Sequence, residues 1–374
     1  MVFAIITHVP HGQIDKQYFA YAPYVREMNI WTKYVDEVIV VAPLESIEKS
    51  DIHLNYEHSK IDFKDIPKVD LLSVSAIFNA IVVAPQIAFQ IYKAMKKANH
   101  IHLRCPGNIG LIACFVQILF PNKVKTAKYA GNWDPNSKQP WSYKLQKFIL
   151  SNTFLTKNMQ VLVYGEWERS SKNIKPFFTA TYKESEKVEV DARSINDCIS
   201  FIYVGTLTSG KRPLYAIQLV EALHKKGLEV TLSLYGNGNE WEKIDHYIHE
   251  NNLNDIIFLK GNQTLEVLKK AYQQSNFIIL PSMSEGWPKA IAEGMFWGCL
   301  PIATRVSCVP NMLDNGERGL LLNLNLEDDV ALIVELVRNP YSYADKVDKS
   351  VLWSRKYTLD LFDKEVKVLL NSCE

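Results

Sequence analysis

The sequence predicts an α/β protein of two doubly wound domains, each built on a parallel sheet covered by helices, that face each other across a cleft. Three observations favour this fold class. The chain has 374 residues, 47% of them hydrophobic, which is enough for two cores. Short β-rich runs alternate with helical patterns in two successive series. Between the series lies a charged stretch without a helical apolar stripe, which indicates a connection between domains.

The first series begins at the N-terminus. Its β-rich runs are separated by helical patterns such as residues 84–98, and they lie at 2–9, 37–43, 69–74 and 100–106. The longest apolar run, 109–120, suits a buried helix and is shorter than a membrane span. The N-terminus lacks the basic region of a signal peptide. We therefore expect neither a leader nor a transmembrane helix.

The second series is more regular. Strand runs at 198–205, 229–236, 255–261 and 276–282 are followed by helical patterns at 212–227, 240–252, 264–275 and 287–297. Parallel strands need crossover connections, so this repetition predicts a parallel sheet. Ligands in such sheets bind beyond the carboxyl ends of the strands, and we therefore expect the site in the loops that leave the strands.

Charge and cysteine content exclude some classes of function. Lys and Arg number 42 against 41 Asp and Glu, so the chain has no general affinity for nucleic acid. The cysteines form no CxxC pair and no metal-ligand spacing, which indicates reduced thiols in a cytoplasmic protein. They are Cys105, Cys114, Cys198, Cys299, Cys308 and Cys373.

Two loops of the second series carry features of an anion site. Lys211 and Arg212 directly precede Pro213, which suits the first position of a helix. Backbone N–H groups and the helix dipole favour an anion there, and two cations would suit a diphosphate; the alternative is a solvated basic turn. In the next loop, Gly236 and Gly238 allow close backbone approach to a ligand. Trp241 stands where a third glycine would complete a dinucleotide fingerprint, so a nicotinamide site is disfavoured.

The stretch "SEGWPKAIAEGMFWGCLPIAT", residues 284–304, places Glu293 among apolar and small residues. Pro288 can start a helix after the strand at 276–282, which puts Glu285, Gly286 and Trp287 in the preceding loop. Glu293 can form a surface pair with Lys289 four positions earlier. However, the helix has little polar face, so we expect the carboxylate to be buried or to face the cleft and accept hydrogen bonds from a bound polyol.

These motifs together resemble the retaining glycosyltransferases of family 4, which have the GT-B architecture of two facing Rossmann-like domains. The resemblance covers residues 199–340 and rests on Glu285 and Glu293 eight positions apart, the "VG…K" loop, the "YGNG" loop and the "DNGERGLLL" turn. It implies that Glu285 holds hydroxyls of the donor sugar and that Glu293 holds the ribose. Lys211 matches the lysine of the family's basic loop. Thr206 stands at the family's arginine position, so Arg212 is expected to supply the missing charge.

The resemblance implies a donor site and an acceptor site. The catalytic residues would be Glu285, Lys211 and Arg212. The donor nucleotide sugar would be bound by Glu293, Gly286, Trp287, Pro288, Gly205, Thr206, Gly236, Asn237, Phe258 and Leu259. In the N-terminal domain Asn132 aligns with the family's usual histidine, and the acceptor side would comprise His11, Arg104, Asn132 and Trp133. His8, His11 and His102 can also be ordinary loop or strand histidines.

The implied function is transfer of a hexosyl group from a UDP-sugar or GDP-sugar to a hydroxyl, with retention of configuration and without a metal or other cofactor. The expected pathway is synthesis of a cell-envelope polysaccharide, lipopolysaccharide or glycolipid. Alternatives are a sugar-nucleotide epimerase, a phosphorylase or an inactive nucleotide-sugar binder of the same fold. A nicotinamide oxidoreductase is less favoured, because its complete glycine fingerprint is missing.

The domains implied are an N-terminal acceptor-binding Rossmann-like domain (1–175), an interdomain connection (176–198), a C-terminal nucleotide-sugar-binding Rossmann-like domain (199–350) and a C-terminal helix (351–374) that packs back on the first domain. Residues 101–150 hold basic and aromatic side chains against the single acid Asp134: Arg104, Lys123, Lys125, Lys128, Lys138, Lys144, Lys147, Trp133, Trp141, Tyr143 and Phe148. Such a patch favours docking on the anionic inner leaflet of the cell membrane, with a glycan or lipid-linked acceptor as partner. The alternative is a solvated basic face over core aromatics.

Overall fold

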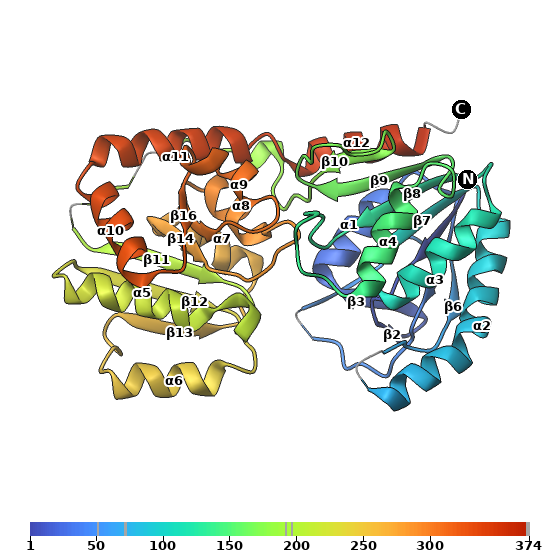
Figure 1. Cartoon of the computed structure of the whole chain (residues 1–374), viewed down its shortest axis with the longest axis horizontal. Coiled ribbons are helices and arrows are strands. Elements are labelled where there is room, and N and C mark those ends of the chain that lie inside the picture. The colour runs from blue at the N-terminus through green and yellow to red at the C-terminus, as the bar shows by residue number, and fades with distance from the viewer. Residues whose placement is uncertain (51, 71–72, 191–192, 196, 372–374) are drawn as a thin grey trace. The chain divides into compact units, whose positions relative to one another are not determined.

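The structure is a computed structural model of the chain, and it describes residues 1–374 except 51, 71–72, 191–192, 196 and 372–374. The chain divides into two compact units, shown in Figure 1. Unit 1 comprises Met1–Phe178 together with Leu361–Glu374, and unit 2 comprises Thr179–Asp360. Each unit is an α/β assembly around its own sheet.

Unit 1 is built on a seven-stranded sheet whose neighbouring strands are all parallel. In spatial order the strands are β10 (Ile174–Phe177), β9 (Met159–Tyr164), β8 (Val124–Tyr129), β7 (His100–Cys105), β1 (Val2–Ile6), β4 (Glu37–Ala42) and β6 (Ile61–Asp65). The central strands β1 and β4 are apolar and β-branched on both faces, as expected of strands covered on both sides by helices. Unit 1 also contains a small antiparallel sheet, formed by β2 (His11–Ile14), β3 (Gln17–Tyr21) and β5 (His53–Asn55).

Five helices belong to unit 1. They are α1 (Ala22–Thr32), α2 (Val74–Lys97), α3 (Asn108–Val116), α4 (Trp141–Ser151) and α12 (Leu359–Asn371), with a short 3₁₀ turn η1 (Gln117–Leu119) after α3. Helices α2, α3 and α4 lie side by side in Figure 1, where α3 contacts both of its neighbours. Helix α12 is the part of the C-terminal region that packs on unit 1, because Phe362 contacts the rings of Phe177 and Phe178.

Unit 2 repeats the parallel arrangement with six strands, in the order β13 (Ile257–Gly261), β12 (Val230–Tyr235), β11 (Ile199–Val204), β14 (Phe277–Leu280), β15 (Leu300–Thr304) and β16 (Leu320–Leu322). Its helices are α5 (Pro213–Lys225), α6 (Trp241–Glu250), α7 (Leu265–Gln274), α8 (Lys289–Phe296), α9 (Val309–Met312), α10 (Leu326–Val337) and α11 (Pro340–Ser354). The four predicted strands and four predicted helices between 198 and 297 are all present, so the sequence patterns of this series are confirmed.

Three expectations for unit 1 differ from the structure. The run 69–74 is not a strand where it is described: Ser73 caps α2, which starts at Val74, while residues 71–72 lie outside the described residues. The strand of this region is instead β6, whose alternating charges make it too polar to stand out in the sequence. Helix α2 has 24 residues and starts at Val74, so it is longer than the apolar pattern at 84–98 because it continues through Pro85. Its residues Ser75–Lys97 are long and apolar enough to cross a membrane by length and composition, contrary to the expectation of no such segment.

The stretch 176–198 is packed rather than a free connection. Tyr182 is 3% exposed and lies against the rings of Phe296 and Trp297 at the end of α8. Arg193 donates hydrogen bonds to the carbonyl oxygens of Trp297 and Gly298, which satisfies acceptors left open where α8 ends. Most of the predicted connection therefore belongs to unit 2.

Candidate active site

The candidate site lies at the carboxyl edge of the unit 2 sheet, where the loops after β11, β12, β14 and β15 meet. Backbone hydrogen bonds join these loops directly. The amide of Leu207 donates to the carbonyl of Asn237 over 3.0 Å, and the amide of Met283 donates to the carbonyl of Gly210 over 2.8 Å. The parallel topology thus brings together segments 30 and 73 residues apart in sequence, at the edge where ligands of such sheets bind.

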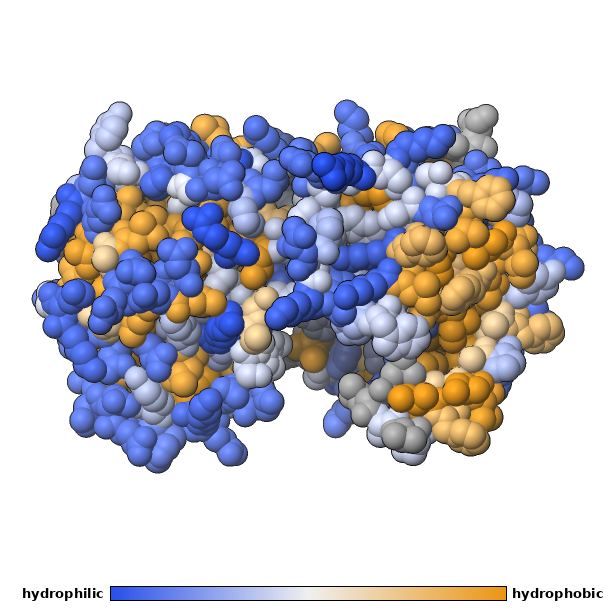
Figure 2. Space-filling model, in the orientation of Figure 1, coloured by the Kyte–Doolittle hydropathy of each residue, from blue (hydrophilic) through white to orange (hydrophobic). Residues whose placement is uncertain are grey.

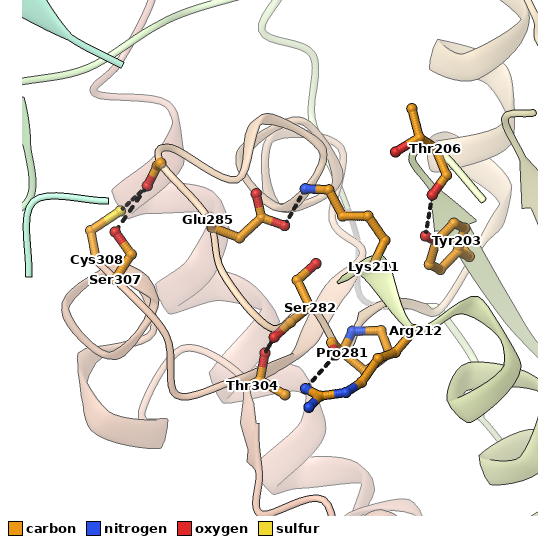
Figure 3. Close-up of polar contacts among 11 residues, drawn as sticks. Tyr203, Thr206, Lys211, Arg212, Pro281, Ser282, Glu285, Thr304, Ser307 and Cys308 are labelled. Atoms are coloured by element: carbon orange, nitrogen blue, oxygen red, sulfur yellow. Dashed lines mark hydrogen bonds and ion pairs between the residues drawn. The ribbon is translucent and has the colours of Figure 1, made fainter. Parts of the chain in front are cut away.

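Glu285 and Lys211 form the central contact of this edge (Figure 3). Lys211 Nζ lies 2.6 Å from Glu285 Oε1, and the two side chains are 30% and 7% exposed. Lys211 is held by the 3₁₀ turn η3 (Ser209–Lys211), and Glu285 by the loop between β14 and α8. The sequence placed both residues in the site, and the structure brings them together as an ion pair that still reaches solvent through the lysine.

Arg212 lies beside this pair but points elsewhere. It adopts left-handed backbone angles as the residue preceding α5, and its guanidinium donates to the carbonyl of Pro281 over 3.4 Å. Pro213 occupies the first position of α5, as the sequence predicted. Arg212 therefore lies at the same edge as Lys211, with its guanidinium 3.4 Å from a backbone acceptor instead of a carboxylate.

The glycines of the next loop are required by loop packing. Gly236 has a φ of +140°, and a Cβ there would lie 1.9 Å from the carbonyl oxygen of Gly205. A Cβ on Gly238 would lie 2.3 Å from the carbonyl oxygen of Leu207. These glycines allow the loops after β11 and β12 to contact each other, which is a structural reason for the "YGNG" motif besides the predicted approach of a ligand.

Thr206 lies in the loop after β11, and its carbonyl accepts a hydrogen bond from the Tyr203 hydroxyl over 3.0 Å. The side-chain oxygen of Asn237 accepts a hydrogen bond from the amide of the next residue, Gly238, over 2.8 Å. Phe258 and Leu259 lie in the edge strand β13, where both are half-buried and Lys260 Nζ lies 4.9 Å from the Phe258 ring centroid. All of these predicted donor residues are thus in unit 2.

The amino end of α8 has no side-chain cap. Its preceding residue, Pro288, contributes no side-chain cap, and the amides of Ile291 and Ala292 turn back to the Pro288 carbonyl. Gly286 is fixed through its carbonyl, which accepts hydrogen bonds from Ser307 and Cys308 over 3.2 Å each. The uncapped first turn and its dipole favour an anion at this position.

The side chain of Trp287 packs against two aromatic rings near the end of α11. Its ring centroid lies 6.0 Å from that of Trp353 and 5.5 Å from that of Tyr357. These contacts anchor the loop that carries Glu285 to α11. The structure therefore shows a packing role for Trp287 beside the donor role implied by the resemblance.

Glu293 answers why a carboxylate stands in an apolar helix. Its two oxygens accept hydrogen bonds from the hydroxyl of Thr181 over 2.6 Å and from that of Tyr272 over 3.1 Å. Burial, reinforced by this carboxylate, raises the pKa of Tyr272 well above its ordinary value, so the phenol stays a donor. The predicted surface pair with Lys289 is not what satisfies Glu293 among the described contacts.

The predicted acceptor residues of unit 1 are held by contacts within the unit. His11 is fully buried in β2, hydrogen-bonded to the Val9 carbonyl and to the Tyr56 hydroxyl, and burial lowers its pKa to about 4. Asn132 accepts a hydrogen bond from the amide of Asp134 over 2.8 Å, and Trp133 is 6% exposed. His11 has the surroundings of a core histidine.

Arg104 joins a buried charge cluster at the ends of β7 and β8. Its guanidinium lies 3.4 Å from Glu27, and Lys128 Nζ lies 2.9 Å from the same carboxylate. Lys128 is fully buried and donates to the carbonyl of Phe178, with the ring of Phe362 5.1 Å away. Burial and the charge of Arg104 lower the pKa of His8, which follows β1 at the same edge.

Some residues of the unit 2 edge gave no sequence signal. Ser282 is fully buried, and its hydroxyl has no hydrogen-bond partner among the described residues. Its carbonyl accepts from the Thr304 hydroxyl over 2.5 Å, which ties the loop after β14 to the end of β15. Thr181, the partner of Glu293, comes from a stretch read as a connection. Each depends on a partner distant in sequence, which pattern reading does not reveal.

Cavities and metal-ligating groups do not add a second centre to this edge. A cavity of about 540 Å³ opens at the amino ends of β8 and β9 in unit 1, lined by Lys125, Lys157 and Asn158 among others. That is the opposite edge from the one where parallel sheets bind ligands. Among the described residues, no three His, Cys, Asp or Glu side chains lie close enough together to hold a metal ion. Of the cysteines, the five described are free, and Cys373 lies outside the described residues.

Comparison with known proteins places this geometry in context. Residues 186–349, which carry the whole unit 2 edge, match the family described as glycosyl transferases group 1. An uncharacterised glycosyltransferase of Methanocaldococcus jannaschii is 31% identical over 122 residues, covering 32% of this chain and 34% of that protein. The chain spans about a third to a half of the length of the first curated relatives it matches.

Solved structures align over the whole chain at lower identity. A lipopolysaccharide outer core galactosyltransferase gives a TM-score of 0.70 at 15% identity, covering 100% of this chain and 99% of the other. The Anabaena protein HepE in complex with UDP and glucose gives a TM-score of 0.70 at 12% identity, with 100% of each chain covered. At such identities the likeness concerns the fold. The chain therefore has the GT-B fold of two Rossmann-like α/β units, and its second unit carries the sequence features of the glycosyl transferases of group 1.

Proposed function

We propose that the protein is a retaining glycosyltransferase of family 4 that transfers a hexosyl group from a nucleoside diphosphate sugar to a hydroxyl of a cell-envelope glycan or glycolipid. The observation that carries the proposal is the Lys211–Glu285 ion pair beside the uncapped amino end of α8. It places a cation and a carboxylate beside the positive end of a helix dipole, at the edge where a sugar diphosphate needs them.

The cation and the helix would stabilise the leaving diphosphate. Transfer breaks the bond between the anomeric carbon and the diphosphate oxygen, so negative charge builds up on the diphosphate in the transition state. Lys211 supports that charge when its Nζ moves from Glu285 to the phosphates, and the first-turn amides of α8 add fixed donors. Arg212 is expected to join them when it leaves the carbonyl of Pro281.

The carboxylates would orient the donor. Glu285, freed from Lys211, can accept hydrogen bonds from hydroxyls of the sugar, since an ionised carboxylate is an acceptor only. Glu293 keeps unused acceptor capacity beside Thr181 and Tyr272, and the ribose hydroxyls of the nucleotide are suitable donors for it. The remaining step, removal of the acceptor proton, is assigned to the leaving phosphate, so that no protein base is required.

The finer assignments rest on the relatives and on the resemblance. The HepE complex contains UDP and glucose, which favours a UDP-sugar over a GDP-sugar as donor. The lipopolysaccharide galactosyltransferase of the same fold favours an envelope glycan as acceptor. Transfer without a metal, a cytoplasmic location and acceptor roles for His11, Arg104, Asn132 and Trp133 stay predictions.

Hydrolysis of nucleotide sugars in the absence of an acceptor tests the proposal. The chain is incubated with UDP-glucose, UDP-galactose, UDP-N-acetylglucosamine and GDP-mannose, and the released sugar is followed by proton NMR. We expect slow release from one of them, with the α-anomer formed first. First formation of the β-anomer would refute retention. No release from any donor, together with saturable UDP binding, would instead favour the inactive binder of the same fold.

A further inference from the structure

Helix α2 presents an apolar surface that the other described residues of unit 1 leave exposed. Five large apolar side chains on it are exposed, and the first turns also expose Pro85. They are Ile77, Phe78, Ile81, Val82 and Phe89. Phe78 and Ile81 are 71% and 66% exposed. Single apolar side chains scattered over a surface are ordinary, but several exposed ones on one helix mark an interaction surface.

The apolar surface continues onto neighbouring helices. Phe115 of α3, Leu119 of η1, and Trp141 and Phe148 of α4 are each at least half exposed. Helix α3 contacts α2 on one side and α4 on the other. Figure 2 shows the result as a broad orange face over this part of unit 1, with blue side chains at its margin. We call this surface, centred on α2 and extended by these four residues, the α2 face.

One side of α2 is committed to the core of its own unit. Ile87, Ile91 and Met95 are fully buried and belong to the hydrophobic cluster beneath the sheet. A helix packed in this way lies along the surface of the unit. We therefore do not interpret α2 as a membrane-spanning helix, although it is long and apolar. Its exposed half has the placement of an amphipathic helix that lies in the plane of a membrane interface.

Charge distinguishes a lipid surface from other partners. Residues 71–165 contain eleven Lys and Arg but a single acid, Asp134; Lys125 and Lys128 are buried, whereas Lys93, Lys96, Lys144 and Lys157 are exposed. Lys93 Nζ lies 4.3 Å from the centroid of the exposed Phe89 ring, and Lys157 Nζ lies 5.3 Å from that of Phe154. Lysines beside immersed aromatic rings match the arrangement found at membrane interfaces, where the ring is buried and the ammonium reaches the headgroups.

Self-association by the α2 face is disfavoured by the same charge. Two copies that met through this face would bring their lysines together without acids to pair them, and like charges in an interface are costly. An anionic bilayer instead offers both a hydrocarbon boundary for the apolar side chains and negative headgroups for the lysines.

The sequence expected membrane docking from residues 101–150, and that assignment needs correction. Lys125 and Lys128 are 1% and 0% exposed, and Trp133 is 6% exposed, so these residues cannot reach a bilayer. Lys128 instead pairs with the buried Glu27. Of that patch, Lys144 is exposed, and the exposed Trp141 and Phe148 belong to the α2 face.

We infer that the α2 face docks unit 1 on an anionic lipid bilayer, with Phe78, Ile81 and Phe89 inserted at the interface and Lys93 and Lys96 against the headgroups. This inference does not depend on the proposed function, because it rests on the exposure and charge of unit 1 alone. Its chemistry requires only an anionic phospholipid surface.

Vesicle sedimentation with the full chain tests the inference. Vesicles of phosphatidylcholine with phosphatidylglycerol are compared with vesicles of phosphatidylcholine alone, at low and high salt. The variant Ile81→Asp is compared with Leu352→Asp on α11 of unit 2, where the replaced leucine is 70% exposed. Circular dichroism melting confirms that both variants are folded.

We expect the wild-type chain and Leu352→Asp to bind the anionic vesicles alike, and Ile81→Asp to bind at least tenfold more weakly. Replacing Lys93 and Lys96 together by Glu should abolish the preference for anionic over neutral vesicles. Equal binding by Ile81→Asp and Leu352→Asp would overturn the inference, as would a wild-type chain that binds neither type of vesicle. A wild-type dimer that Ile81→Asp converts to a monomer, observed by light scattering, would overturn it in favour of self-association.

Discussion

Replacement of Lys211 by methionine separates a role in the site from a role in stability. The change keeps most of the side-chain volume and removes the charge that lies 2.6 Å from Glu285. Two unit charges about 4 Å apart interact by about 4 kcal/mol at an effective dielectric constant of about 20. Because the lysine is 30% exposed, solvent screens part of this, and we take roughly half, about 2 kcal/mol, for its contact with a diphosphate in the transition state. That corresponds to a loss of about thirtyfold in kcat/KM.

The free energy of unfolding should fall in Lys211→Met and partly recover when Glu285→Gln is added. Lys211→Met removes the ion-pair partner of a carboxylate that is 7% exposed, which should lower the free energy of unfolding by about 1 to 3 kcal/mol. Adding Glu285→Gln neutralises that carboxylate, so part of the stability should return. Urea unfolding measures both effects, since the transition midpoint shifts with stability.

The matched control is Lys225→Met. Lys225 pairs with Glu221 in α5 of the same unit, at 2.5 Å, and is 69% exposed. Its removal should change the free energy of unfolding by less than about 1 kcal/mol and leave turnover unchanged. The reasoning would be refuted if Lys211→Met turned over the donor as fast as Lys225→Met, or if Glu285→Gln destabilised the Lys211→Met chain further.

Three further outcomes are expected. Glu293→Gln should weaken nucleotide binding by about 1 to 3 kcal/mol, because a carboxylate that holds charged hydrogen bonds is lost; unchanged calorimetric affinity in the folded variant would remove Glu293 from the donor site. Lys128→Met should lower the free energy of unfolding by about 1 to 3 kcal/mol because it removes the nearer of two cations on the buried Glu27 and leaves only Arg104, 3.4 Å away, while Lys144→Met on the surface should cost less than about 0.5 kcal/mol; similar urea midpoints would contradict the buried pair. Burial lowers the pKa of His11 and His100 to about 4 and that of His102 well below its ordinary value, so unfolding at a pH of about 5.5 should take up at least about two protons and stability should fall as the pH drops from about 6.5 toward 4. Calorimetry in buffers of different ionisation enthalpy counts those protons, and an uptake below one would show that these histidines are solvated.

The regular part of the fold was predictable because its signal is local. The strands and helices of unit 2 between β11 and α8 each carry a continuous apolar or amphipathic pattern. Strand β6 carries none, since four of its five residues are only half-buried and its acids and lysine face outward at the sheet edge. The helical pattern recognised at 84–98 begins ten residues too late, since α2 starts at Val74, where Ser73 caps it by accepting from the amide of Ala76.

The candidate site was predictable only as far as motifs reach. The resemblance of motifs assigned Glu285 and Lys211 to the site separately, and the parallel topology explains why residues so far apart in sequence meet. Thr181 could not be assigned, because nothing in its charged surroundings shows that it donates to Glu293. Lys128 was misplaced for a related reason: a buried lysine looks like a surface lysine until its partner Glu27, about a hundred residues earlier, is known.

Calorimetric titration of UDP and GDP into the wild-type chain and into Lys211→Met tests the central claim most directly. The claim is that the carboxyl edge of unit 2 binds a nucleoside diphosphate through Lys211 and the amino end of α8. We predict saturable binding of one nucleotide per chain, with UDP preferred, and an affinity at least tenfold weaker in Lys211→Met than in Lys225→Met. Equal affinities in the two variants, or no binding of either nucleotide at millimolar concentration, would contradict the account.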